Sequence, residues 1–551
     1  MRLTALVGTL LFCALVIKSV PASCSVAPFD GAIVEGTVVS AMGGRPLPRA
    51  KVFLNFVGKN QPPEVVSTDD AGRFLLRNID PGTYRLSASK EGFFTDEHLF
   101  YQATIDVSEG RRSSGTLIRL LPLAVLKGRV VEQHNDPMQH VAISVYGLDY
   151  FRGQPRLNAI AHGVTDDRGE YRISGVRPGS YFLMADYDAH REWTSAFGNT
   201  KVNRLEPELA YADVFFPDTP DILQAQKVEV HAGDESEVDF ALNGVPGVSI
   251  QGRILNGITG MPSAKPSIEI YQGRFTAAAI HNAQVSVHPE GFLIENVSPG
   301  LYTLRATFSE GDNPYTGEQM VRVGNGGVRN LELVAMPHFE VRGHIRTTDG
   351  KAARAHLSVE FAAIGSRSGA FFNADDVFRV SANTSDLKFT GKLQPGDHYR
   401  VRVLGLPADY YLKSVLIAGQ DVPQNDLVIG GDGVDLELLI SPGAGRIDGL
   451  AFNSRNEAVR GSYIALLPEG STQIDSDLIR RTRADGNGKF SLDGLPPGSY
   501  RLLAWEDINL EEMVNNPDLF RPYEKDSQAV RIEEQGQYSV SIVPISAARS
   551  Q

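Results

Sequence analysis

The sequence predicts an all-β protein made of five antiparallel β-sandwich domains in tandem. Two observations carry this prediction: a turn motif recurs along the chain, and each copy leads into alternating apolar residues. The motif reads Pro-Gly-x-Tyr, with one extra residue before the tyrosine in the fourth copy, and it starts at Pro81, Pro178, Pro299, Pro395 and Pro497. Proline and glycine favour a chain reversal, and a period of two indicates a strand with one buried face. Because no segment keeps a helical period, we expect only short helices, near Gln224 and over 511–520.

Each unit contains the same elements in the same order. It opens with apolar-x-Gly-x-apolar, and the central residues of the five copies are Gly36, Gly128, Gly252, Gly343 and Gly449. Glycine inside a strand often marks a bulge or a close backbone approach. A second alternating strand follows, then a hairpin such as the one at 68–74, where Asp bonds its own backbone and Gly takes a left-handed conformation. The Pro-Gly-x-Tyr strand and a closing hairpin complete the unit. Many short strands at this spacing are typical of a β-sandwich.

Short seams that contain proline or glycine separate the units, at 122–125, 245–247, 336–337 and 442–443. The predicted domains are therefore 31–122, 123–245, 246–337, 338–443 and 444–551. The second carries a polar insertion at 186–208, and the fourth is divergent. Short proline-containing seams restrict swivelling, so we expect a semi-rigid array.

The N-terminus has the pattern of an export signal. Arg2 precedes an apolar run at 4–17, and small residues allow cleavage after Ala22, so 1–22 reads as a signal peptide. The run is too short for a transmembrane span, and no later stretch approaches span length. We therefore expect a secreted, periplasmic or outer-surface protein without a transmembrane helix in the mature chain. Cys24 lies where a bacterial lipoprotein carries its lipid, although Pro21 departs from the usual pattern, so a lipid anchor and simple cleavage both stay open.

Composition and motifs argue against several function classes. The formal charge of -13 disfavours a nucleic-acid partner, because phosphates require a basic surface. The sequence contains no His-Glu-x-x-His, no Gly-x-Ser-x-Gly and no phosphate-binding loop, so we expect no enzyme, no cofactor and no metal site. Acidic turns such as Asp69-Asp70 and Asp166-Asp167 offer calcium two or three oxygens. Calcium takes six to eight, so ordinary turn chemistry is the favoured explanation.

Aromatic residues near loops are the candidate ligand contacts. Trp193 lies in the polar insertion, and Tyr410 and Tyr411 lie beside a predicted strand end. Packing is the favoured explanation for Tyr146, Tyr150, Phe151, Tyr410 and Tyr411, and packing at the rim of the fifth domain is the favoured explanation for Trp505. The sequence thus predicts speculative contacts at Trp193, Tyr410 and Tyr411.

The order of these motifs resembles the carboxypeptidase regulatory-like domain, a transthyretin-like and Ig-like β-sandwich related to carbohydrate-binding modules. The third copy departs from it, with His288-Pro289-Glu290-Gly291-Phe292 in place of the Thr-Asp hairpin, and the fourth departs at 386–389. The resemblance implies a non-catalytic, exported bacterial multidomain protein that binds a polysaccharide or cell-envelope glycan, without assigning any sugar-contacting residue. The alternative is a structural or adhesion stalk that engages surface proteins.

Overall fold

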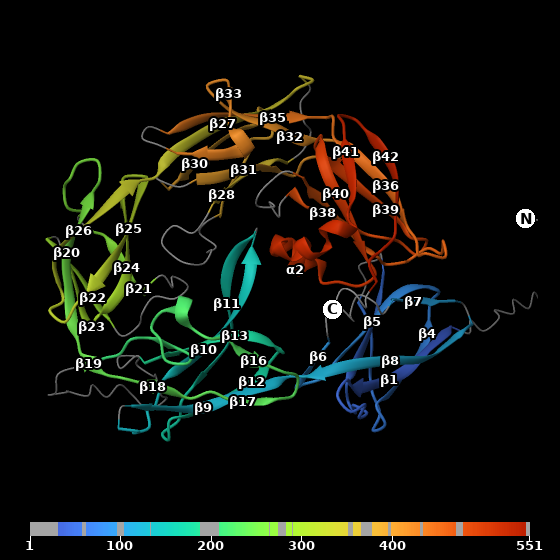
Figure 1. The fold of residues 1–551 in the computed structure, drawn as a ribbon, viewed down its shortest axis with the longest axis horizontal. Coiled ribbons are helices and arrows are strands. Elements are labelled where there is room, and N and C mark those ends of the chain that lie inside the picture. Colours follow the sequence, from blue (N-terminus) through green and yellow to red (C-terminus); the bar gives the residue numbers. More distant parts are fainter. Residues whose placement is uncertain are drawn as a thin grey trace, which may run out of the picture. The chain divides into compact units, whose positions relative to one another are not determined.

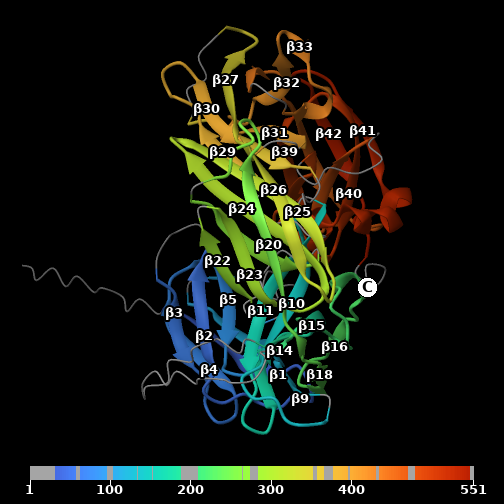
Figure 2. The same ribbon diagram turned by 90° about the vertical axis from the view of Figure 1, so that its left-hand side faces the viewer.

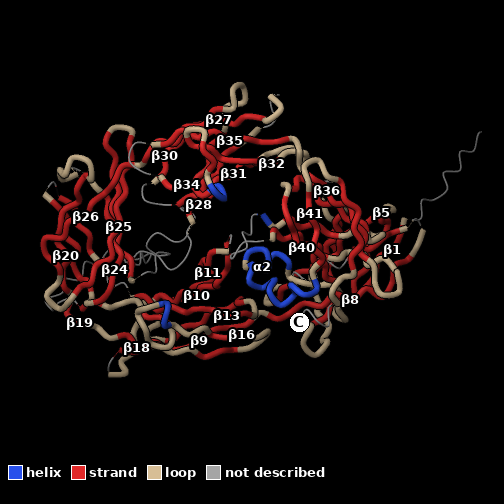
Figure 3. Tube along the Cα trace, turned by 45° about the horizontal axis from the view of Figure 1, so that its top comes forward, coloured by secondary structure: helices blue, strands red, loops and turns tan. Residues whose placement is uncertain are grey.

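The computed structural model describes residues 31–57, 62–95, 104–108, 110–132, 134–151, 153–187, 209–263, 265–273, 283–288, 290–350, 356–364, 377–394, 398–429, 433–469 and 478–546. Strands dominate, and the described helices are short (Figures 1 and 3). The chain divides into two compact units, Met1–Lys90 with Ala103–Leu120 and Glu91–Gln102 with Leu121–Gln551. In the described part of the chain, no helix is long and apolar enough to cross a membrane.

One pattern of strand pairing recurs along the chain, and we number its copies repeats 1 to 5. The opening strand pairs antiparallel with the strand after the hairpin and parallel with the last strand of the repeat. The second strand pairs antiparallel with the strand of the Pro-Gly-x-Tyr motif, here called the motif strand. This recurrence confirms the predicted all-β sandwich class. The five domain boundaries stay a prediction, because repeats 2 to 5 form one compact unit.

Repeat 1 contains two four-stranded sheets, β4-β1-β8-β6 and β3-β2-β5-β7. Its strands are β1 (Ala32–Ser40), β2 (Lys51–Phe56), β3 (Glu64–Ser67), β4 (Arg73–Ile79), β5 (Gly82–Ser89), β6 (Phe93–Phe94), β7 (Thr104–Val107) and β8 (Arg112–Pro122).

Repeat 2 has the same plan with an added segment after its motif strand. Its elements are β9 (Ala124–Glu132), β10 (Ala142–Phe151), β11 (Gln154–Val164), β12 (Glu170–Val176), β13 (Gly179–Asp186), β14 (Leu209–Ala210), β15 (Val214–Phe215), the 3-10 helix η1 (Ile222–Gln224), β16 (Val228–Val230), β17 (Glu235–Glu237), β18 (Phe240–Leu242) and β19 (Val245–Pro246). Strand β15 extends the sheet β11-β10-β13. The expected short helix near Gln224 is η1.

Repeat 3 differs, because its strands form one seven-stranded sheet in the order β21-β24-β25-β26-β20-β23-β22 (Figure 2). The strands are β20 (Val248–Asn256), β21 (Ser267–Gln272), β22 (Gln284–His288), β23 (Gly291–Val297), β24 (Gly300–Glu310), β25 (Asn313–Val323) and β26 (Val328–Pro337). Strand β25 forms a long hairpin with β24, eleven residue pairs in register, and also pairs with β26, which connects what are two separate sheets in the other repeats.

Repeats 4 and 5 return to two sheets. Repeat 4 contains β27 (Phe339–Thr347), β28 (Ser358–Ala363), β29 (Val377–Ser381), β30 (Lys388–Leu393), β31 (His398–Leu404), β32 (Tyr411–Ile417), β33 (Gln420–Asp421), η3 (Pro423–Asn425), β34 (Asp426–Val428) and β35 (Val434–Ser441). Repeat 5 contains β36 (Gly445–Ala451), β37 (Tyr463–Pro468), β38 (Arg480–Arg483), β39 (Lys489–Leu495), β40 (Gly498–Trp505), α2 (Leu510–Asn515), η5 (Pro517–Asp526), β41 (Gln528–Ile532) and β42 (Gln537–Ile542). Helices α2 and η5 confirm the expected helical segment at 511–520.

Each motif tyrosine fixes its own turn. The hydroxyl donates a hydrogen bond to a backbone carbonyl four residues upstream, or five upstream in the copy with the inserted residue. The pairs are Tyr84 with Asp80 (3.0 Å), Tyr181 with Arg177 (2.9 Å), Tyr302 with Ser298 (2.7 Å), Tyr399 with Gln394 (3.2 Å) and Tyr500 with Pro496 (2.8 Å). Burial raises the pKa of Tyr302 to about 12, so its hydroxyl stays a donor. The motif therefore encodes both a turn and the bond that closes it.

The glycine of each opening strand lies directly opposite an aromatic residue of the strand after the hairpin. The pairs are Gly36 with Phe74, Gly128 with Tyr171, Gly252 with Phe292, Gly343 with Phe389 and Gly449 with Phe490. A Cβ on Gly449 would lie 2.1 Å from the Phe490 ring. The glycine thus leaves the space that the ring occupies, which is the close approach that the sequence predicts.

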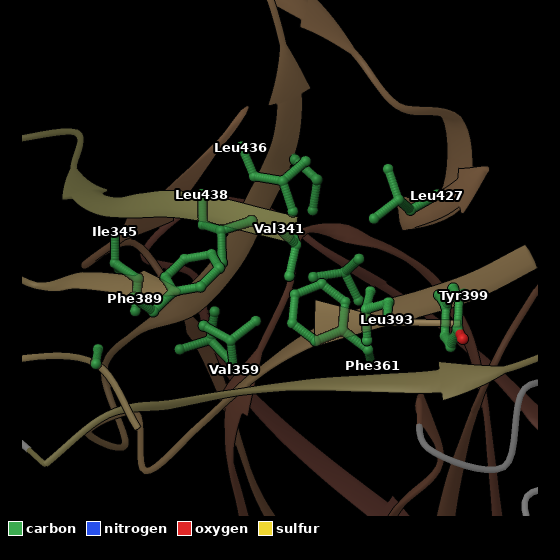
Figure 4. Close-up of a cluster of buried hydrophobic side chains, with 14 of the residues drawn as sticks. Val341, Ile345, Val359, Phe361, Phe389, Leu393, Tyr399, Leu427, Leu436 and Leu438 are labelled. Carbon is green, nitrogen blue, oxygen red and sulfur yellow. The ribbon is translucent and has the colours of Figure 1, made fainter. Parts of the chain in front are cut away.

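The core of a repeat lies between its two sheets. In repeat 4 the apolar side chains of β27, β28, β30, β31 and β35 point toward one another (Figure 4). Phe361 and Phe389 are both buried there, with ring centroids 6.3 Å apart. Tyr399 lies at one end of this cluster, and its hydroxyl reaches out to the turn.

Hydrogen bonds join successive repeats of the second unit at every seam. They link repeat 2 to 3, repeat 3 to 4, and repeat 4 to 5. Examples are Gln272 Nε2 to the Asp213 carbonyl (2.5 Å), Lys392 Nζ to the Asp312 carbonyl (2.5 Å) and Ser441 Oγ to Glu534 Oε1 (3.0 Å).

Candidate functional site

The aromatic residues singled out from the sequence have different surroundings. Trp193, Cys24 and the signal segment 1–22 lie outside the described residues, so they stay predictions. Tyr411 is only 7% exposed, and burial raises the pKa of its hydroxyl. Tyr410 is half-buried against the core of repeat 4. Tyr411 therefore packs instead of offering an exposed contact, because its ring is buried.

Trp505 lies in a second core rather than at a rim. Its side chain is fully buried between the outer face of the β37–β40 pair and the helical segment α2–η5. The ring lies 5.9 Å from Phe520 and meets Tyr523 edge-on at 5.5 Å. Tyr146 is buried in the same manner in repeat 2, where the segment that includes β15 and η1 covers its sheet. Tyr150 is half-buried, and the Phe151 side chain lies outside the described features.

Every aromatic side chain in the described part of the chain is buried or half-buried. The exposed large hydrophobic side chains of that part are aliphatic, such as Ile160 and Val285. Sugar faces usually stack on exposed rings. The described surface therefore offers no stacking platform of the kind that the carbohydrate interpretation expects.

The acidic turns use their carboxylates to hold the turn. Asp69 Oδ1 accepts the N–H groups of Ala71 and Arg73 at 2.9 and 2.8 Å, and Asp166 and Asp485 make the equivalent pairs. The bond from the Arg73 N–H is the main reason why the pKa of Asp69 lies below its usual value. Among the described residues, no group of three His, Cys, Asp or Glu side chains is placed to hold a metal ion.

Ion pairs cover the outward face of the opening-strand sheet in repeats 1, 2, 4 and 5. Most pairs join neighbouring strands or neighbouring positions of one strand, and the Arg172–Glu235 pair spans β9. They include Arg112 with Glu35, Lys127 and Arg172 with Glu235 (3.1 and 2.8 Å), Arg346 with Glu437 (2.7 Å) and Arg446 with Asp448 (2.8 Å). Arg172 and Lys127 together lower the pKa of Glu235 to about 2.

The same face of repeat 3 is a polar groove of about 720 Å³. Its polar side chains, none of which makes an ion pair or hydrogen bond with a described residue, are Gln251, Arg253, His288, Glu290, Asn330 and Glu332. The backbones of Gly291 and Gly252 approach closely at this groove, since a Cβ on Gly291 would lie 2.3 Å from the Gly252 carbonyl oxygen. The lining of the groove includes residues of the sequence departure at 288–292, where the usual aspartate of the hairpin is missing. We name it the repeat-3 groove.

Two buried carboxyl groups face each other where repeat 2 meets repeat 3. Strands β13 and β15 pair Ala185 with Val214, so the next pair outward is Asp186 with Asp213. The two residues are only 5% and 4% exposed. Burial, and then the charge of Asp186 and a hydrogen bond with it, raise the pKa of Asp213 well above its usual value. Burial and the neighbouring carboxyl group of Asp186 thus favour the protonated form of Asp213.

Gln272 of repeat 3 holds the backbone next to this acid pair. Its Oε1 accepts the Asp213 N–H at 2.8 Å, and its Nε2 donates to the carbonyls of Asp213 and Pro220 at 2.5 and 2.9 Å. The acid pair and this amide therefore form a structural junction. Sequence reasoning missed it, because the pair exists only once β15 lies beside β13.

A second buried charge lies on the outer face of β28. Glu360 is fully buried, and Arg379 of β29 and Arg402 of β31 donate to its two oxygens at 2.6 and 2.5 Å. The three residues occupy one row across three strands. Two guanidinium groups thus compensate one buried carboxylate.

Comparisons with known proteins give limited likeness. No curated protein matches the chain significantly. Among solved structures, it is similar to a streptococcal ancillary pilin, with a TM-score of 0.21 and 13% identity over 54% of this chain and 99% of that one. The corresponding values are 0.22, 15%, 39% and 97% for GBS52, the minor pilin of Streptococcus agalactiae, and 0.15, 10%, 77% and 74% for the Bacillus anthracis TIE protein. TM-scores this low support no functional argument. Residues 33–116 match the family model of the carboxypeptidase regulatory-like domain, the family that the turn motifs suggest.

Proposed function

We propose that this chain is a non-catalytic structural protein, exported to the cell envelope or beyond, whose linked β-sandwiches engage protein partners in an adhesion-type role. The observation that carries the proposal is the set of hydrogen bonds at the seams between repeats 2 and 5, such as the Gln272 bonds to Asp213. Bonds of this kind oppose swivelling and favour a semi-rigid scaffold. Export rests on the pattern at 1–22.

A non-catalytic role agrees with the use of the polar groups. The acidic turns bond their own backbone, both oxygens of Glu360 accept bonds from Arg379 and Arg402, and Asp213 is buried beside Asp186. Each of these groups is engaged within the fold, and none is presented as a nucleophile or a base in a groove.

A polysaccharide or cell-envelope glycan is the second candidate ligand, and the repeat-3 groove is the observation that favours it. Its side chains carry both charges and several amide groups, which suit the hydroxyl groups of a neutral sugar chain. An array of envelope polysaccharides tests this candidate. Binding that is lost in Arg253→Ala or Trp193→Ala, and kept in the ion-paired Arg342→Ala, would support it.

Binding of the exported chain to envelope fractions of the producing organism separates the two candidates. We expect binding that disappears after the fractions are treated with protease and survives periodate oxidation of their sugars. The opposite pattern would replace the protein-partner proposal with the glycan one. Absence of binding to either fraction, with the protein shown to be folded, would contradict both.

A further inference from the structure

Strand β21 has a neighbour on one side only. In the other four repeats the second strand is paired on both sides, by the motif strand and by a companion strand: β3, β11, β29 or β38. In repeat 3 the strand at the companion's place in the sequence, β22, pairs with β23 instead. Among the described residues, β21 therefore pairs with β24 alone and ends the sheet.

The open part of β21 is about as long as the companion strands. Its last residues, Tyr271 and Gln272, are buried, and Gln272 is bound to repeat 2. Ser267 to Ile270 remain, with Ser267 and Glu269 exposed. The companion strands β3 and β38 each form four residue pairs with their second strand. The part of β21 that lacks a described partner on this side is thus as long as a short extended segment.

Repeat 4 shows what a filled position looks like. Ile270 lies opposite Leu304 and Phe361 lies opposite Val401, each two residues after the motif tyrosine, so Ile270 and Phe361 occupy equivalent positions. Glu269 is therefore equivalent to Glu360. Arg305 lies opposite Glu269 as Arg402 lies opposite Glu360. The companion strand β29 then adds Arg379 on the other side of Glu360. Repeat 3 has the glutamate and the first arginine and lacks the second arginine.

The charges near β21 fit a basic incoming residue. Arg305 forms its ion pair with Glu318, at 2.5 Å, rather than with Glu269. Glu269 accepts a hydrogen bond from the Tyr271 hydroxyl at 2.7 Å and is otherwise exposed. Companion strands elsewhere place Arg379, Arg481 and His162 at the corresponding position, and Val65 in repeat 1.

We propose that the β21 edge binds an extended segment of a partner protein as an added strand, with an arginine or lysine of that segment facing Glu269. Backbone hydrogen bonds supply the pairing, and the basic side chain sets the register. Apolar residues on either side of the basic one face the core, as Phe378 and Val380 of β29 do. The inference rests on the proposed engagement of protein partners and names the site and the chemistry of the partner.

A capped peptide with the sequence of β29, Val377–Ser381, is the probe, because β29 fills this position in repeat 4. We expect saturable binding to the full chain by calorimetry and slower amide exchange at 267–270. Glu269→Lys should weaken binding about fivefold or more, since opposite charges facing each other across strands stabilise the pair. The matched control is Glu295→Lys, the same charge change on β23, which already has neighbours on both sides. Circular dichroism confirms that both variants fold.

A charge swap keeps the test decisive. The peptide with Arg379→Glu should bind Glu269→Lys better than it binds the natural chain. Equal binding to the natural chain and to Glu269→Lys, no binding at all, or protection at 358–363 through displacement of β29 would each overturn the inference. Envelope binding that persists in Glu269→Lys would also overturn it, while leaving the engagement of protein partners in place.

Discussion

The hydroxyl of Tyr500 donates a 2.8 Å hydrogen bond to the carbonyl of Pro496, four residues upstream, and so closes the turn that leads into β40. The same bond recurs in every repeat. It explains why the motif keeps a tyrosine at a position where phenylalanine would fill the core equally well.

Tyr500→Phe should therefore destabilise repeat 5 by about 1 kcal/mol, the net value of one hydrogen bond with its acceptor left behind. Amide hydrogen exchange of β40 measures the free energy of local opening. Tyr523→Phe is the control, because the Tyr523 ring packs on Trp505 and its hydroxyl has no hydrogen bond with a described residue. Equal effects of the two changes would show that the hydroxyl bond to Pro496 contributes nothing.

Gly449→Ala should cost roughly 1–3 kcal/mol, the usual range for overpacking, because the new Cβ would lie 2.1 Å from the Phe490 ring. Phe490→Leu made in the same chain should recover part of this loss, and a double-mutant cycle measures the coupling. Gly486→Ala is the control, since nothing lies within 4 Å of a Cβ there. A neutral Gly449→Ala would mean that the opening strand shifts without cost.

The acid pair predicts a specific pH dependence. The folded pKa of Asp213 is raised above its ordinary 3.8, so folding retains a proton and the stability of the junction falls as pH rises from about 4 through the raised value. Asp213→Asn keeps the shape and removes this titration. The variant should have a higher unfolding midpoint than the natural chain at neutral pH and a flatter profile.

Asp69→Asn is the control for that profile. The pKa of Asp69 is lowered, chiefly by the Arg73 N–H, so its stabilising effect is present above the unfolded pKa and is lost as pH falls through the folded one. The two variants should therefore change the profile in opposite directions. A natural chain whose stability rises between pH 4 and 7, with an unchanged profile in Asp213→Asn, would contradict the raised pKa of Asp213.

Glu360→Gln should destabilise repeat 4 by on the order of 3 kcal/mol, because it removes the buried charge that Arg402 and Arg379 compensate. Hydrogen exchange of β28 reports the loss. Glu35→Gln, which breaks the exposed pair with Arg112, should have little effect. Comparable losses in both variants would show that burial of Glu360 adds nothing.

Local patterns in the sequence were sufficient to predict the strands, the turns and the buried motif tyrosines. A period of two and the turn residues act within a few positions of one another. The burial of Trp505 was not predictable in this way, because it depends on α2 and η5 folding back over β37 and β40. The meeting of Asp186 with Asp213 depends likewise on the pairing of β15 with β13.

The pairing of β22 with β23 instead of β21 could not be predicted from local patterns either. The same alternation suits either neighbour, and the pairs of β22 with β23 reach His288 and Gly291. The candidate aromatic contacts were less predictable still, since Tyr410 and Tyr411 are adjacent in the chain and yet one is half-buried and the other buried. Trp193 stays a prediction.

The parallel pairing of the first and last strands has a mechanical consequence. Because β27 and β35 run side by side in the same direction, tension applied to the two ends of repeat 4 pulls these strands past each other. Their seven residue pairs are then loaded together in shear instead of opening one at a time. Every repeat has this geometry, so a chain anchored at one end and bound at the other would resist extension in each repeat.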